Sequence, residues 1–169
     1  MKIVGLTGGG ALCELGTAMD VQLFFDCLNT YAVEKYPEQD WGMLTDRLYR
    51  RYLRLEDLDI ASALMAQVKQ VFATLSNKAI NWQNVAVDST KTRLDPSKET
   101  LAEIFGKYFD NFAHCVESAK ISHEGFKSFP GYTYEAVRLV IADQPWFLAE
   151  KKRPLEEYDA LEGEPFWKC

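Results

Sequence analysis

The side chains of this sequence best suited to nucleophilic or metal chemistry are four cysteines and two histidines. They are widely scattered: Cys13, Cys27, Cys115, Cys169, His114 and His123. Structural zinc sites use four such ligands at short spacings such as C-x-x-C, and metal-binding helices use Glu-x-x-His or His-Glu-x-x-His. None of these patterns occurs in the sequence. We therefore expect free thiols, no metal site and no cofactor.

A catalytic cysteine or histidine is not indicated either. His114 and Cys115 are adjacent, and adjacent residues of a helix point about 100° apart, so they cannot easily share a proton. Cys115 falls on an apolar helical stripe, which predicts a core position. His123 lies between Ser122 and Gly131, a stretch that we expect to be a solvated loop. These residues predict a protein that is not an enzyme.

A glycine triplet, Gly8 to Gly10, follows the first apolar run and invites a phosphate-binding interpretation. A phosphate-binding loop needs Gly-Lys followed by Ser or Thr, and a dinucleotide-binding fingerprint that starts at Gly8 needs Gly or Ala where Cys13 stands. Neither requirement is met. Because glycines supply the positive φ angles of tight turns, residues 2–7 and 11–15 are expected to form a β-hairpin.

Apolar residues at helical spacing predict the elements that pack around this hairpin. Thr17 and Asp20 indicate a helix N-terminus, and the expected helices cover residues 17–36, 43–54, 57–75 and 95–119. Residues 79–87 resemble a strand. Residues 132–143 suit either a helix or a buried strand, and the spacing favours a helix. Phe105 and Phe109 of the fourth helix should pack against Phe72 of the third.

The expected fold class is α+β, a small antiparallel sheet with an N-terminal β-hairpin packed against four or five helices. A chain of 169 residues with 47% hydrophobic and 13% aromatic residues can bury one sizeable core, so residues 1–169 are expected to form a single domain. No apolar run is long enough to cross a membrane, and residues 1–7 lack the features of a signal peptide. We expect a cytoplasmic protein with no membrane partner.

The net charge of −6 argues against direct binding of nucleic acid, which requires Lys and Arg to neutralise phosphates. Four arginines gather between residues 47 and 54, and acidic residues follow at once. Glu56, Asp57 and Asp59 are expected to neutralise this arginine face, which then becomes an ordinary solvated surface.

The most unusual surface is the acidic and aromatic tail, residues 154–169. It is either a solvated extension or a protein interface, because carboxylates steer a basic partner while Tyr and Trp supply contact area. The candidate partner-binding residues are Glu156, Glu157, Tyr158, Asp159, Glu162, Glu164 and Trp167.

Over roughly residues 1–120 the chain resembles the bacterial immunity proteins of polymorphic-toxin and contact-dependent growth inhibition systems, in particular the family numbered seventy. The resembling stretches are Met1 to Thr7, Ala11 to Gly16, Phe24-Phe25, and Thr100-Leu101-Ala102-Glu103 leading into Tyr108-Phe109. The resemblance implies a cytoplasmic inhibitor that binds the C-terminal domain of a cognate toxin and blocks its active site or substrate surface. Such toxins are often nucleases with basic clefts, which an acidic inhibitor would suit.

Two other functions remain open at this point. The chain is an adaptor or regulatory module for a different bacterial protein, or it is an enzyme whose site the motifs do not reveal. A large secreted protein with a variable C-terminus, encoded directly upstream, would favour the immunity protein. A deep polar pocket would favour the enzyme.

Overall fold

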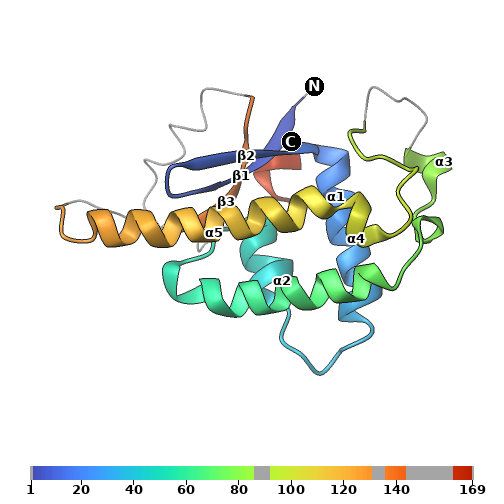
Figure 1. Cartoon of the computed structure of the whole chain (residues 1–169), viewed down its shortest axis with the longest axis horizontal. Helices are drawn as coiled ribbons and strands as arrows, with labels where there is room; N and C mark the ends of the chain where they lie inside the picture. The colour runs from blue at the N-terminus through green and yellow to red at the C-terminus, as the bar shows by residue number, and fades with distance from the viewer. Residues whose placement is uncertain (1, 86–91, 131–135, 144–161, 169) are drawn as a thin grey trace.

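The computed structural model describes residues 2–85, 92–130, 136–143 and 162–168. These residues form an α+β fold with a three-stranded antiparallel sheet, as predicted (Figure 1). The strands are β1 (Ile3–Gly8), β2 (Ala11–Thr17) and β3 (Val137–Ile141), in the order β2-β1-β3.

The N-terminal β-hairpin is confirmed. Gly8 pairs with Ala11, and Gly9 between them has a φ of 57°, a conformation that side chains other than glycine rarely adopt. The glycine triplet therefore forms the turn of this hairpin.

The third strand corrects the sequence prediction, which favoured a helix over residues 132–143. Residues 137–141 form β3, which lies antiparallel to β1 from Val4↔Ile141 to Gly8↔Val137. All five residues are buried, including Arg138. A short apolar run that is buried on both faces shows no alternation, so its sequence cannot be distinguished from a buried helical turn. Residues 132–135 lie outside the described part of the chain.

Three longer helices carry most of the core: α1 (Ala18–Cys27), α2 (Leu58–Ala73) and α5 (Gly106–Phe126). The shorter helical segments are η1 (Leu28–Val33), η2 (Met43–Leu48), η3 (Leu55–Asp57), η4 (Asn77–Ala79), α3 (Trp82–Val85), α4 (Leu101–Ile104) and η5 (Phe166–Lys168). The predicted start of α1 is confirmed, because Thr17 and Asp20 form a reciprocal capping box. Within the part of the chain that is described, every helix is too short or too polar to span a bilayer.

Helix boundaries differ from the prediction in several places. The predicted strand at 79–87 is wrong over its described part, which contains η4 and α3. The predicted helix at 43–54 stops early, because the Leu53 N–H donates to the Val137 carbonyl at 2.7 Å. The helix that was predicted to end at residue 119 continues to Phe126 in α5, so His123 lies on a helix and not in a loop.

The predicted helix start at Asp95 is also wrong. The Asp95 carboxylate accepts hydrogen bonds from the Ser97 N–H at 2.9 Å and the Ser97 hydroxyl at 2.6 Å, which closes a local turn. Thr100 instead caps α4, its side chain accepting from the Glu103 N–H at 3.3 Å. An aspartate followed by proline is typical of both a turn and a helix start, and here the turn is formed.

The core lies between the sheet and the helices, with α5 between the hairpin and α2 (Figure 1). Phe24 of α1 is its centre, with ring centroids 5.4 Å from Phe105 and 5.0 Å from Tyr108. Phe72 of α2 lies 5.8 Å from both Phe105 and Phe109. The predicted packing of these two apolar stripes is therefore confirmed.

Candidate functional site

The acidic tail is only partly described. Glu156, Glu157, Tyr158 and Asp159 lie outside the described residues. Glu162 and Glu164 are exposed, and Glu164 forms an ion pair with Lys168. The described end of the tail therefore presents two exposed carboxylates, one of which is paired with Lys168, and their role in binding a partner stays a prediction.

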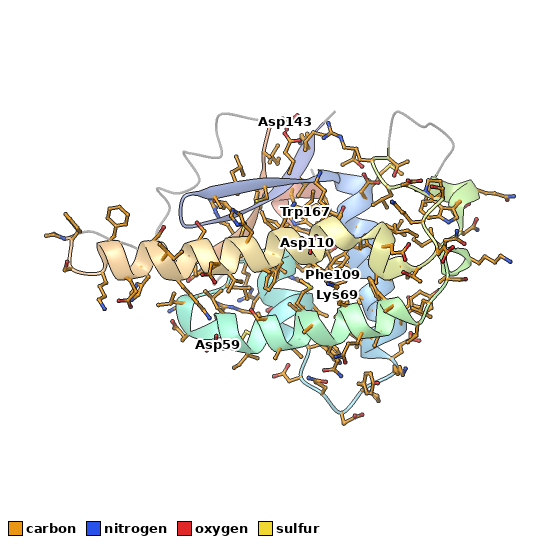
Figure 2. All side chains as sticks on the ribbon, in the orientation of Figure 1. Asp59, Lys69, Phe109, Asp110, Asp143 and Trp167 are labelled. Atoms are coloured by element: carbon orange, nitrogen blue, oxygen red, sulfur yellow. The ribbon has the colours of Figure 1, made fainter. Side chains whose placement is uncertain are left out.

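Trp167 differs from the expectation that it contacts a partner. Its side chain is 0% exposed, stacks on Phe25 at 6.3 Å and meets the Tyr49 ring edge-on at 5.6 Å. Its indole N–H donates to the Tyr49 carbonyl at 2.9 Å, and Figure 2 shows it inside the fold. Trp167 is thus a core residue that fixes the end of the chain. Sequence could not identify its partner, a carbonyl 118 positions away.

The anchored segment η5 borders a hollow on the outer face of α1. The hollow has a volume of about 330 Å³ and a mainly apolar lining. It is lined by Ala18, Met19, Gln22, Leu23, Asp26, Val85 and Lys168. Below, this set together with Glu164, the ion-pair partner of Lys168, is called the α1 surface.

The spacing of residues on α1 explains the hollow. Phe24 and Phe25 point into the core, whereas Met19, Leu23 and Asp26 recur at intervals of four and three on the opposite side. Met19 is 51% exposed. A methionine side chain adapts its shape to a partner and is common at protein interfaces. This surface was not predicted from the sequence, although Met19 and Leu23 are apolar residues on the polar side of the helix.

The polar rim of the hollow is ordered by a chain of hydrogen bonds. The Tyr49 hydroxyl donates to Gln22 Oε1 at 2.8 Å, and Gln22 Nε2 donates to Asp26 Oδ1 at 2.8 Å. The same Tyr49 packs against Trp167. The anchored tail and the acidic rim of α1 are therefore connected through one side chain.

A second, smaller hollow of about 210 Å³ lies between α2 and α5. Lys69, Phe109 and Asp110 are among its lining residues, and Figure 2 labels them on these two helices. The hollow exists because several of its lining residues have small side chains: Ser62, Ala66 and Ala113. Neither hollow contains a cysteine or a histidine among its lining residues.

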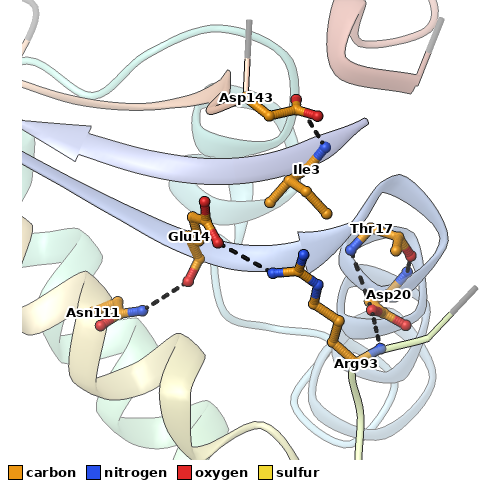
Figure 3. Close-up of polar contacts among 7 residues, drawn as sticks. All are labelled: Ile3, Glu14, Thr17, Asp20, Arg93, Asn111 and Asp143. Atoms are coloured by element: carbon orange, nitrogen blue, oxygen red, sulfur yellow. Dashed lines mark hydrogen bonds and ion pairs between the residues drawn. The ribbon is translucent and has the colours of Figure 1, made fainter. Parts of the chain in front are cut away.

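One buried carboxylate has the surroundings of a structural group. Asp20 is 0% exposed and accepts from the Thr17 N–H at 3.2 Å, the Thr92 hydroxyl at 2.6 Å and the Arg93 N–H at 2.9 Å (Figure 3 draws its contacts to Thr17 and Arg93). Burial, and then the charge of Asp20, raise the pKa of Tyr108 well above 10. These contacts hold the chain at residues 92–93 against the start of α1.

The remaining predicted candidates are accounted for by packing and ion pairs. Cys115 is buried, as predicted, and in the described residues no three His, Cys, Asp or Glu side chains are placed to hold a metal ion. The arginine face is ion-paired, in part as predicted, because Asp57 lies 4.0 Å from Arg47. Asp46, which was not among the expected partners, lies 3.1 Å from Arg50 and 3.5 Å from Arg51. The expected partner Asp59 instead pairs with Lys120 at 2.7 Å.

No protein family, curated protein or solved structure matches this chain. The resemblance to immunity proteins therefore rests on the residues of the sequence alone.

Proposed function

We propose that this protein is an immunity protein, which binds a cognate bacterial toxin domain in the cytoplasm of the producing cell and neutralises it without catalysis. The observation that carries the proposal is the α1 surface, an open apolar hollow with an acidic rim. Protein interfaces commonly combine an apolar centre, where water is excluded, with a charged border.

The charges of the α1 surface indicate the kind of partner. Asp26 and Glu164 are exposed there, and Lys168 is already paired with Glu164. Glu162, two residues before Glu164, is also exposed. The whole chain carries a net charge of −6. A basic protein would be attracted to this surface before contact, and its apolar side chains would then occupy the hollow beside Met19. A nuclease toxin, whose cleft must bind phosphates, has the required positive charge.

Blocking such a toxin requires no reacting group in the inhibitor. An acidic protein seated on a basic cleft competes with nucleic acid for the same positive charges. The hollow beside Met19 would fix the register of the complex, because apolar contacts require matching shapes.

The proposal is tested by co-expression. The toxin to be tested is the C-terminal domain of a large secreted protein, if one is encoded directly upstream of this chain, and its catalytically inactive mutant is the control for toxicity. We expect growth to be restored only when this protein is present, and the inactive toxin domain to co-elute with it in gel filtration. Continued killing with the full chain present in excess would contradict the proposal. A turnover by the purified protein that one substitution abolishes would also contradict it.

A further inference from the structure

Cys13 of β2 and Cys115 of α5 face each other across the interface between the hairpin and the helix. Their sulfur atoms lie 4.0 Å apart, although the residues are 102 positions apart in the sequence. The Cys115 thiol also points to the Leu6 carbonyl, with 3.6 Å between sulfur and oxygen. Leu6 is the residue that pairs with Cys13 in the sheet. The two thiols therefore share one small region above the hairpin.

Two glycines of the hairpin allow α5 to pack closely enough for this approach, because they have no side chain. A Cβ atom at Gly8 would lie 2.4 Å from the Cys115 carbonyl oxygen, and one at Gly9 would lie 2.3 Å from the Ser118 carbonyl oxygen. Any larger residue would push the helix away from the strands. The hairpin glycines thus bring the backbone of α5, and Cys115 with it, onto β1 and β2.

The two thiols differ in accessibility. Cys13 is partly exposed, whereas Cys115 is fully buried. Burial, and then the neighbouring Cys13, raise the pKa of Cys115 to about 12. A thiol reacts as its thiolate, so Cys13 is the side that a reagent from solution meets first.

We propose that Cys13 and Cys115 form an oxidisable dithiol, a modification site whose co-reactant is a small-molecule disulfide. The Cys13 thiolate attacks one sulfur of the reagent, which forms a mixed disulfide and releases one small thiol. The Cys115 thiol then gives up its proton and attacks Cys13 Sγ, which forms the protein disulfide and expels the second small thiol. Two protein thiols are oxidised, and one reagent disulfide is reduced to two thiols.

The separation of the two sulfur atoms is compatible with the second step. A disulfide has sulfur atoms about 2.05 Å apart, so the present pair must close by roughly 2 Å. Rotation of two side chains about their Cα–Cβ bonds moves sulfur atoms over such distances. The product would tie β2 to α5, and neither cysteine belongs to the α1 surface, so this inference does not depend on the proposed function.

The experiment treats the purified full chain with oxidised glutathione under native conditions and maps disulfides by peptide mass spectrometry. We expect a Cys13–Cys115 linkage, with the loss of the mass of two hydrogen atoms. Cys27→Ser should form the same linkage, whereas Cys13→Ser should not, and Cys13→Ser is expected to fold because Cys13 is partly exposed. Three results would overturn the proposal: glutathione that stays on Cys13, a linkage only to Cys169, or Cys27 reacting as fast as Cys13.

Discussion

Replacing Trp167 by Ala tests whether the end of the chain belongs to the core. Trp167 is 0% exposed and contacts Phe25 and Tyr49 through its ring. Truncating a buried Trp or Phe to Ala costs about 3 to 5 kcal/mol in other proteins, because apolar contacts are lost and a cavity remains. The indole also donates to the Tyr49 carbonyl, and leaving such an acceptor unpaired adds on the order of 1 kcal/mol.

Trp167→Phe separates these two contributions. The phenyl ring keeps most of the stacking on Phe25 and loses the hydrogen bond to Tyr49, so the free energy of unfolding should fall by about 1 to 3 kcal/mol. Trp167→Ala should lower it by about 4 to 6 kcal/mol. Since whole domains are stable by about 5 to 15 kcal/mol, the alanine variant should lose a large share of its stability.

Urea unfolding followed by far-ultraviolet circular dichroism measures these changes without depending on tryptophan fluorescence. Phe129→Ala is the matched control, because Phe129 is an aromatic residue that is 59% exposed, and it should change the free energy of unfolding by less than about 0.5 kcal/mol. A cost below about 1 kcal/mol for Trp167→Ala would show that the indole is not part of the core.

Three further predictions concern the hairpin, a buried thiol and the tail. Gly8→Ala should lower the free energy of unfolding by about 1 to 3 kcal/mol in urea melts, because its new Cβ would clash with α5. Gly10→Ala is the control and should leave the stability unchanged, because no atom lies within 4 Å of its new Cβ. Equal effects of the two substitutions would exclude close packing at Gly8. Burial, and then Asp26, raise the pKa of Cys27 from 9.0 to about 12, so the folded chain keeps a proton that the unfolded chain loses and stability falls as the pH rises through this range. Cys27→Ala should make that fall shallower, by up to about 1.4 kcal/mol per pH unit; an unchanged slope in melts across the range would refute this. Replacing Glu162 and Glu164 by Lys should slow association with the toxin domain and flatten its salt dependence in surface plasmon resonance, and an unchanged rate would return the tail to an ordinary solvated surface.

The elements that could be predicted from the sequence are those with local signals. The hairpin could be predicted from its glycines alone. The helix α2 was predicted at 57–75 and found at Leu58–Ala73, because its apolar residues repeat every three or four positions. β3 was missed because its identity as a strand depends on pairing with β1, more than a hundred residues earlier. The secondary structure of residues 137–141 is therefore determined by tertiary contacts and not by a local sequence pattern.

The candidate site shows the same division. The sequence identified the accessible glutamates of the tail from composition alone, but it placed Trp167 beside them on the surface. Trp167 is held by Tyr49 and Phe25, and no local pattern links these residues to the end of the chain. Met19 was visible in the sequence as an apolar residue on the polar side of α1. Only the structure shows that Met19 and Lys168 of η5 line the same hollow.

The most direct test of the proposed function is the binding of the toxin domain to two matched variants. Met19 is 51% exposed on the α1 surface and Ile60 is 54% exposed on α2, so each can be changed to Asp with little effect on folding. Isothermal titration calorimetry should show that Met19→Asp weakens binding by roughly tenfold or more, the loss expected for a central interface residue, while Ile60→Asp binds like the unchanged protein. Equal affinities for Met19→Asp and the unchanged protein, with both folded, would contradict binding at the α1 surface.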